Sequence, residues 1–335
     1  MKKRVVRFLV TIFPLLVSLL GFVAEATSQT RFKVVYNTIT PPSAPLWIAK
    51  DKGFFEKYGI SVDLVFIESG PRSVQALLSG DALVTTTAGP AVANAKLSGA
   101  DVVMIAGLVN VFPFFLVAHP GITSSSALPG KIGATQVFGS GGDLALRMAL
   151  RSLGLDPEKD VKLRVIGSSS LRVQALEKRL VDFAMLEPMV TFEAKKSNLN
   201  ILVDFTEKRI PYQHSGIITL ESSLKKHRTQ ILNFLRATLE GLSFYKRNKE
   251  ETLNVIAKYT RLRDRAVIAT SYEWFKTVFS EIPYATPEGF KTILDMIYLN
   301  RKEIPHLDSK TLVDRTLLDA LANDGFIQSL NAGSR

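Results

Sequence analysis

Histidine and cysteine are the residues most often used for metal binding and nucleophilic catalysis, and this sequence offers few of them. It contains four histidines and no cysteine. His119, His214, His227 and His306 do not stand at the short spacings that place two metal ligands on one helix face or in one hairpin. The sequence therefore predicts neither a metal site nor a cysteine nucleophile.

One short pattern matches a catalytic motif. Ser222 and Lys225 have the S-x-x-K spacing of some acyl-transfer enzymes, but the companion motifs of those enzymes are absent from the sequence. A serine ahead of a helical pattern is far more often a helix N-cap. We therefore predict no catalytic residue and no enzyme activity.

Two glycine-containing stretches could indicate nucleotide binding. GSGGD at residues 139–143 begins like a dinucleotide fingerprint, but Leu144 stands where the third glycine belongs. Gly130 and Lys131 lack the Ser or Thr that follows the lysine of a P-loop. No nucleotide and no other cofactor is therefore expected. The stretch 139–143 still places small residues at a helix start, where free N–H groups could approach an anion or a polar solute, and a purely structural turn is the alternative.

A repeated four-residue segment indicates which helices and strands must position these residues. VQAL occurs at residues 74–77 and again at 173–176, which are 99 residues apart. Each copy follows an apolar, β-branched run and a Gly/Ser loop, has helical spacing, and precedes a second strand that ends at Pro90 or Pro188. Alternating strands and helices imply a parallel-type sheet flanked by helices. We therefore expect an α/β fold with two similar lobes.

In an open parallel sheet, the loops after the strand ends form the ligand crevice. Arg72 could pair there with an acidic ligand group, although a lone arginine is more often solvated. Glu187 follows a strand and could accept a hydrogen bond from an amine or amide, or be a helix-start charge. Aromatic residues near strand ends pack in a core by default, but one or two could line a pocket. The twelve candidate ligand-binding residues are Ser43, Trp47, Gly70, Arg72, Ser73, Phe112, Gly139, Ser140, Gly141, Glu187, Tyr212 and His214.

The first 26 residues have the composition of a secretory signal peptide. A basic segment precedes an apolar run from Phe8 to Val23, and Ala24-Glu25-Ala26 fits a signal peptidase site. An uncleaved membrane anchor is the alternative. Because the chain has no cysteine, a lipoprotein is excluded, and we expect a protein exported to a bacterial periplasm.

The net charge does not indicate nucleic-acid binding. The formal charge is +11, and removal of the leader, with its four basic residues and Glu25, leaves +8. Lys and Arg are scattered among acidic residues along amphipathic helices instead of forming a basic stripe. A solvated basic surface and no nucleic-acid partner are expected.

From Ser223 onward, strand patterns give way to consecutive amphipathic helices, which need an existing sheet to cover. We expect residues 27–117 and 216–335 to form a discontinuous first lobe, and residues 118–215 a continuous second lobe. Chain crossovers near residues 116–119 and 212–217 would then act as a hinge.

Four segments carry a resemblance to a known family: SAPLWIAKDKGFFEKYGISVDLV, VQALLSGDALVTT, LPGKIGATQVFGSGGDLALRMALRSLGL and VQALEKRLVDFAMLEP. They resemble the periplasmic solute-binding proteins of the sulfonate, nitrate and taurine type, relatives of the thiamine-pyrimidine synthase. The resemblance covers about residues 31 to 325 and implies the two-lobed type II periplasmic-binding-protein fold, with a solute trapped between the lobes. It also implies an inner-membrane ABC permease as partner, and we expect a monomer.

Two other functions remain open at this point. A pyrimidine-synthase-like enzyme on the same fold would need a cysteine-rich motif, which this chain lacks, and a signal peptide points away from cytoplasmic biosynthesis. A periplasmic adaptor for a sensor is the second. For the solute we expect a small polar or anionic organic molecule, either sulfonate-, nitrate- or taurine-like or a pyrimidine or other aromatic compound, with an acceptor end and a donor end.

Overall fold

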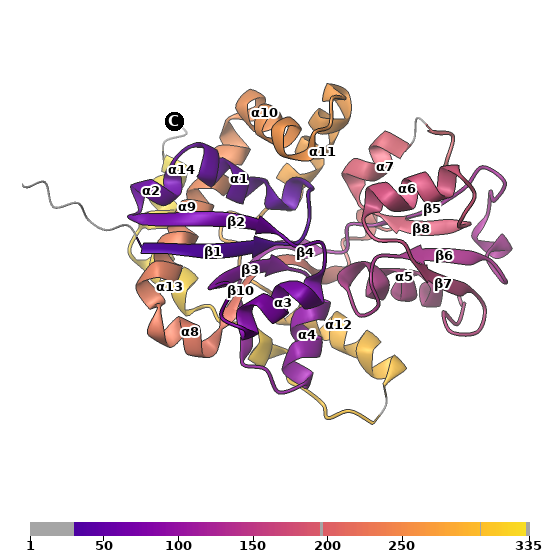
Figure 1. The fold of residues 1–335 in the computed structure, drawn as a ribbon, viewed down its shortest axis with the longest axis horizontal. Helices are drawn as coiled ribbons and strands as arrows, with labels where there is room; N and C mark the ends of the chain where they lie inside the picture. Colours follow the sequence, from indigo (N-terminus) through magenta and orange to yellow (C-terminus); the bar gives the residue numbers. More distant parts are fainter. Residues whose placement is uncertain (1–29, 195–196, 302, 333–335) are drawn as a thin grey trace, which may run out of the picture.

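The computed structural model describes residues 30–332 except 195–196 and 302, so the expected signal peptide at residues 1–26 lies outside the described residues. Two five-stranded sheets lie at opposite ends of the molecule, as Figure 1 shows. The first has the order β2 (Ile60–Phe66), β1 (Thr30–Tyr36), β3 (Val84–Thr87), β10 (Pro211–Leu220) and β4 (Val102–Val111). The second has the order β7 (Lys162–Val165), β6 (Ile132–Thr135), β8 (Phe183–Leu186), β5 (Phe115–Ala118) and β9 (Asn200–Asp204).

Both sheets are mixed: they contain the parallel pairing expected from the sequence together with antiparallel strands. β1, β2 and β3 pair in parallel, but β10 runs antiparallel to β3 and β4. In the second sheet, β6 pairs in parallel with β7 and β8, whereas β5 runs antiparallel to β8 and β9. The antiparallel strands β5 and β10 are the strands that directly follow a crossing between the sheets, so each enters its sheet from the opposite end. The α/β class and the two-sheet division agree with the repeat pattern.

The chain changes sheets earlier than the sequence analysis placed it. β5 begins at Phe115 in the second sheet, although residues 115–117 were assigned to the first lobe. β10 begins at Pro211 in the first sheet, although residues 211–215 were assigned to the second lobe. The segments that cross are therefore residues 112–114 and 205–210.

Each VQAL segment lies in a helix on its own sheet. In the first lobe the helices before the crossing are α1 (Ala44–Asp51), α2 (Phe54–Lys57), α3 (Gly70–Leu78) and α4 (Gly89–Leu97). In the second they are α5 (Gly141–Ser152), α6 (Ser169–Glu177) and α7 (Pro188–Ala194). α3 contains the first VQAL and packs on β3, and α6 contains the second and packs on β8. Both begin after a serine N-cap whose hydroxyl accepts a backbone N–H of the first turn.

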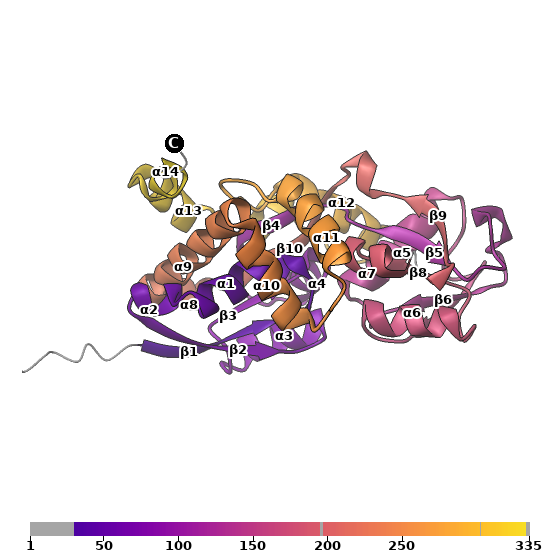
Figure 2. The same cartoon turned by 90° about the horizontal axis from the view of Figure 1, so that it is seen from above.

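After β10 the chain is helical, as the sequence pattern predicts. The helices are α8 (Glu221–Lys226), α9 (Arg228–Arg247), α10 (Lys249–Thr260), α11 (Arg265–Val278), α12 (Pro287–Asn300), α13 (Thr316–Asn323) and α14 (Phe326–Ala332). α9 packs on α1 and α2, and α12 packs on β10 and α4. Gly241 lets α9 approach α1, because an added Cβ would collide with the carbonyl oxygen of Pro45. α11 contacts α7 of the second lobe, and Figure 2 shows these helices next to each other.

In the part of the chain that the structure describes, no helix has the length and apolar composition needed to cross a bilayer.

Candidate functional site

A cavity of about 260 Å³ lies between the two sheets. Its walls come from the loops that follow β1, β2 and β3 in the first lobe and β6, β7 and β8 in the second. The crossing segment adds Phe114, β10 adds His214 and Ser215, and the loop after α10 adds Leu262. The cavity is therefore at the position where loops after strand ends were expected to meet.

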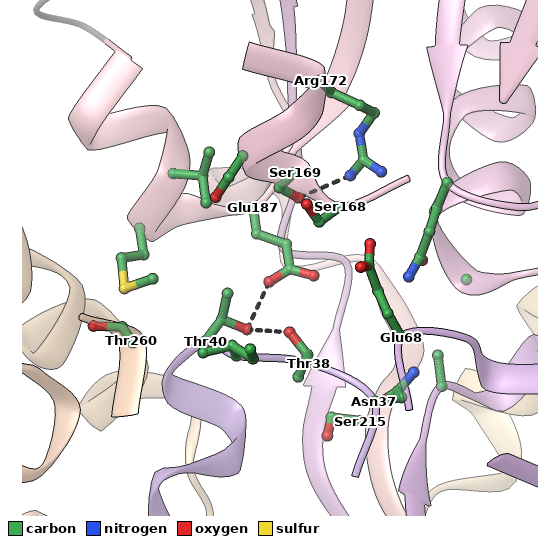
Figure 3. A pocket seen from close by; sticks show the side chains of 18 of the residues that line it. Asn37, Thr38, Thr40, Glu68, Ser168, Ser169, Arg172, Glu187, Ser215 and Thr260 are labelled. Carbon is green, nitrogen blue, oxygen red and sulfur yellow. Dashed lines mark hydrogen bonds between the residues drawn. The ribbon is translucent and has the colours of Figure 1, made fainter. Parts of the chain in front are cut away.

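A chain of polar side chains connects the lobes inside this cavity (Figure 3). The hydroxyls of Thr38 and Thr40 lie 2.6 Å apart, and Thr40 Oγ1 donates a 2.9 Å hydrogen bond to Glu187 Oε2. His214 Nε2 lies 3.8 Å from Glu187 Oε1. Thr40 comes from the loop after β1, and Glu187 from the loop after β8. One carboxylate therefore contacts the first lobe directly.

Local structure holds Thr40 and Glu187 in place. Thr40 precedes the 3-10 helix η1 (Pro41–Ser43), but its side chain makes no capping bond there and is available to Glu187. The carbonyl oxygen of Glu187 accepts bonds from both the N–H and the hydroxyl of Thr191, each at 2.9 Å. These bonds fix the backbone of Glu187 at the start of α7.

His214 is a buried imidazole at the base of the cavity. It is 7% exposed, and its ring meets the edge of Phe114 at 5.1 Å between centroids. Its Nδ1 is buried with no hydrogen-bond partner among the described residues. Burial lowers the pKa of His214 because it penalises the charged form, while the charge of Glu187 acts in the opposite direction. The imidazole is therefore neutral at pH 7.

Arg172 is a buried guanidinium that lines the cavity from α6. Its Nε donates to Met185 O at 3.2 Å, Nη1 to Gly167 O at 2.5 Å, and Nη2 to Ser169 Oγ at 2.8 Å. Burial lowers its pKa to about 10, although the charges of Glu187 and Glu68 raise it. Arg172 therefore stays charged at neutral pH and ties the loop after β7 to β8.

Glu68 enters the cavity from the first lobe, in the loop between β2 and α3. Its Oε1 is buried and has no hydrogen-bond partner among the described residues. A Cβ added to Gly167 of the second lobe would lie 3.5 Å from this oxygen, so the carboxylate reaches across to the loop that Arg172 holds. Figure 3 shows the side chains of Glu68 and Glu187 both pointing into the cavity.

Three of the twelve candidate residues line this cavity: Gly141, Glu187 and His214. Gly141 is the first residue of α5, where an added Cβ would lie only 2.7 Å from Ala88 Cβ. The glycine therefore lets the start of α5 approach the loop after β3 in the other lobe. The remaining nine candidates lie outside the cavity lining.

Trp47 and Phe112, two aromatic candidates for the cavity lining, pack in the core. Trp47 is fully buried and stacks on Tyr259 with ring centroids 4.9 Å apart. Phe112 is also fully buried, and its ring is 5.1 Å from that of Tyr212. Both side chains are on the apolar face of their own segment, which the sheet and the C-terminal helices cover. Phe66 and Phe114 are the aromatic residues of the described cavity lining.

Ser43 and Tyr212 support the cavity from behind. Ser43 Oγ donates a 2.8 Å bond to the carbonyl oxygen of Thr38, and Tyr212 Oη donates a 3.2 Å bond to that of Gly141. Both side chains are buried and lie outside the lining. They hold the backbone of residues that do line it.

The start of α3 does not present a charge to the cavity. Arg72 is exposed and lies outside the lining, while Ser73 is buried and donates to Ser69 O at 2.8 Å. Gly70 is also buried, and a Cβ there would lie 2.7 Å from Thr87 Oγ1. The buried face of α3 turns toward the sheet, which leaves Arg72 on the solvent side.

The start of α5 was expected to offer free N–H groups to an anion, but the chain's own side chains accept two of them. Ser140 Oγ accepts from Asp143 N at 3.3 Å, and Asp143 Oδ2 accepts from Gly139 N at 3.0 Å. Gly139 adopts a positive φ of 79°, which a glycine adopts without strain. An anion at this turn would meet the carboxylate of Asp143.

The sequence analysis missed Thr38, Thr40, Glu68 and Arg172. The repeat carried a signal for Arg172, because it precedes the second VQAL as Ser73 precedes the first, 99 residues earlier. Both positions are buried in the structure. The threonines and Glu68 stand in short loops without a periodic pattern. Among the described residues, no group of three His, Asp or Glu side chains could hold a metal ion.

Two relatives are similar to this chain in sequence. YtlA of Bacillus subtilis (strain 168), whose name describes it as a candidate binding protein, is 23% identical over 309 residues, which cover 90% of this chain and 92% of YtlA. The riboflavin-binding protein RibY of Chloroflexus aurantiacus is 26% identical over 223 residues, which cover 64% of this chain and 62% of RibY.

Solved structures share the fold at low identity. The periplasmic nitrate-binding protein NrtA from Synechocystis PCC 6803 superposes with a TM-score of 0.73 at 16% identity, covering 88% of this chain and 89% of NrtA. A ligand-binding component of an ABC-type import system from Staphylococcus aureus gives 0.72 at 15%, covering 87% and 98%. The periplasmic aliphatic sulphonate binding protein SsuA from Escherichia coli gives 0.68 at 19%, covering 87% and 99%.

The two-lobed fold of these binding proteins is thus the fold of this chain. A family described as NMT1/THI5 like matches residues 40–252. Because that match spans more than half of the 335 residues, the chain belongs to the NMT1/THI5-like family.

Proposed function

We propose that this protein is the solute-binding component of an ABC importer and captures a small polar organic molecule between its lobes. The observation that carries the proposal is the cavity of about 260 Å³ whose polar lining comes from both lobes. Such a cavity is complete only when the lobes are together, so a ligand that contacts both lobes favours the closed form. The volume lies just below the usual range of about 300 to 1,000 Å³ for drug-sized ligands, which favours a compact solute.

A binding role is supported by the chemistry of the cavity. Among the described residues, no hydrogen bond joins a serine or threonine hydroxyl of the lining to His214, so the lining shows no paired nucleophile and base. The relatives named above are also described as binding proteins. An enzyme of the pyrimidine-synthase kind is the alternative. Recovery of an unchanged ligand after long incubation with the protein would argue against it.

We infer a periplasmic location from the leader. Cleavage after Ala26 would release a mature chain that begins at Thr27. N-terminal sequencing of the protein from a periplasmic extract tests this inference. Recovery of the intact leader in the membrane fraction would contradict it.

We also infer that each sheet belongs to one lobe and that the crossing segments form the hinge. Of the described residues, the first lobe would comprise 30–111 and 211–332, and the second would comprise 115–204. Residues 112–114 and 205–210 would absorb the rotation. The protein would act as a monomer that docks on an inner-membrane permease.

The test of the function has two steps. A ligand at a hundredfold excess over its dissociation constant adds about 2.7 kcal/mol to the free energy of unfolding, so a thermal-shift screen of the mature protein should find the solute. The liganded protein should then stimulate ATP hydrolysis by a reconstituted ABC permease and its ATPase. A ligand that binds but never stimulates that transporter would favour the sensor-adaptor alternative.

A further inference from the structure

The cavity contains more negative than positive side chains. Among the described lining residues, Glu68, Glu187 and Glu193 are acidic, Arg172 is the one guanidinium, and His214 is neutral at pH 7. The structural neighbours named above include proteins whose names state that they bind nitrate or an aliphatic sulphonate. A bare oxyanion would enter this cavity against its carboxylates, so the lining of this chain disfavours such a ligand.

We propose that Glu68 and Glu187, one from each lobe, select a compact organic solute that carries N–H donors and no net negative charge. Amines, amidines, amides and amino-substituted heterocycles have this chemistry, whereas nitrate and simple sulfonates do not. This inference rests on the proposed function, since it names the substrate class of the same cavity.

Glu68 supplies the first acceptor. Its Oε1 is buried and has no hydrogen-bond partner among the described residues. A carboxylate oxygen that is removed from water without a donor is costly, and a ligand N–H at this position would remove that cost. The oxygen also lies close to Gly167 of the opposite lobe, as the 3.5 Å approach of a Cβ placed there shows. A donor bound to Glu68 would therefore be held between the lobes.

Glu187 supplies the second acceptor. Thr40 donates to its Oε2, while His214 Nε2 lies 3.8 Å from Oε1, beyond hydrogen-bond distance. One oxygen is thus fixed by the first lobe and the other can accept a donor from a ligand. The bond from Thr40 orients the carboxylate, so the acceptor is in place before the ligand arrives.

Arg172 does not reverse this preference. Three of its five N–H groups bond to Met185 O, Gly167 O and Ser169 Oγ. Its guanidinium therefore holds the loop after β7 and offsets part of the carboxylate charge. The N–H groups that remain can bind a neutral acceptor such as a ligand carbonyl. An anion that approached them would still face Glu68 and Glu187.

A thermal-shift panel of matched compounds tests the charge class on the mature wild-type protein. Taurine and isethionate share a two-carbon sulfonate and differ in an ammonium versus a hydroxyl, and ethanolamine lacks the sulfonate. Benzamidine, benzamide and benzoate share a ring and differ in charge; cytosine, riboflavin and nitrate complete the panel. We expect the largest rise in melting temperature, at least ~3 °C, from a donor-bearing compound without net negative charge.

The other outcomes of the panel distinguish a failure of the charge inference from a failure of the proposed solute-binding function. If nitrate, isethionate or benzoate gives the largest rise, the charge inference is overturned while solute binding stands. If no compound raises the melting temperature, solute capture of these classes is contradicted, and the inference falls with it.

Calorimetry with the best compound of the panel then tests the two residues. Glu68→Gln and Glu187→Gln keep the size of the side chain and remove its charge, and each should weaken binding about tenfold to hundredfold. Glu177→Gln is the matched control, because Glu177 is an exposed acid at the end of α6 in the second lobe and lies outside the cavity lining, and its affinity should stay within twofold. Wild-type affinity in both cavity variants would refute the assignment of these carboxylates.

Discussion

Thr40 and Glu187 lie in different lobes, 147 residues apart in the sequence, and are joined by a 2.9 Å hydrogen bond across the cavity. The bond links the two lobes within the cavity lining. Thr40 lies in the loop after β1 and Glu187 in the loop after β8, so each sheet contributes one partner of the bond. The contact therefore reports directly on how far the lobes are apart.

The first prediction concerns this bond. Thr40→Val removes the hydroxyl and keeps the shape, so the ligand-free protein should open, and the free energy of unfolding should fall by about 1 kcal/mol. Small-angle scattering should give a larger radius of gyration than for the wild type. Thr292→Val is the control, since that hydroxyl bonds within α12. Equal radii for Thr40→Val and the wild type would mean that other contacts hold the lobes together.

The second prediction compares the stability contributed by Arg72 and Arg172, the arginines that precede the two VQAL segments. Arg172→Met leaves the carbonyl oxygens of Met185 and Gly167 without their buried donor, so the free energy of unfolding should fall by roughly 2 to 4 kcal/mol. Arg72→Met should change it by less than about 0.5 kcal/mol, because Arg72 is exposed. Urea denaturation of both variants measures the difference. Similar losses would show that the guanidinium of Arg172 adds no net stability.

The arginines also show what sequence could and could not predict. The VQAL repeat predicted two sheets with a helix on each, because strand and helix periodicities depend only on local residue order. It could not tell which arginine faces inward. Arg72 and Arg172 both stand near a helix start, but only Arg172 occupies the buried position that Ser73 occupies in the first copy. A comparison of the two copies, in which Ser73 and Arg172 both stand directly before VQAL, would have favoured Arg172 as the inward-facing arginine.

The cavity residues that lie in loops could not be predicted from the sequence pattern for a different reason. Thr40 and Glu68 meet the second lobe only because the chain crosses between the sheets twice and brings distant loops together. Conversely, Trp47 and Phe112 are large and apolar, so the same property that suggested a pocket wall buried them in the core. The orientation of β5 and β10 also depends on the crossings, which strand patterns do not encode.

The third prediction uses two neighbouring glycines. Gly141→Ala should push the start of α5 away from Ala88, because the added Cβ would lie 2.7 Å from Ala88 Cβ. Overpacking of this kind costs about 1 to 3 kcal/mol. Because the two atoms belong to different lobes, this cost destabilises the closed form, and affinity for the solute should fall. Gly142→Ala is the control, since its nearest atom would be Gln136 Cβ at 3.4 Å. Calorimetry on both variants measures the effect, and equal affinities would show that the two lobes can shift at this contact without loss.

The last prediction concerns acid sensitivity. Burial lowers the pKa of His214 in the folded protein and outweighs the opposing charge of Glu187, so the unfolded chain binds the proton more readily. Stability from the neutral imidazole is thus complete above the ordinary histidine pKa of about 6.5 and is lost as pH falls below it, by up to about 1.4 kcal/mol per pH unit. His214→Gln removes the titrating group, so the free energy of unfolding should decline less between pH 7 and pH 5 than in the wild type. His227→Gln, at an exposed histidine, should keep the wild-type slope. Urea denaturation at pH 7, 6 and 5 measures the three slopes. Parallel slopes for the wild type and His214→Gln would show that another group governs the acid response.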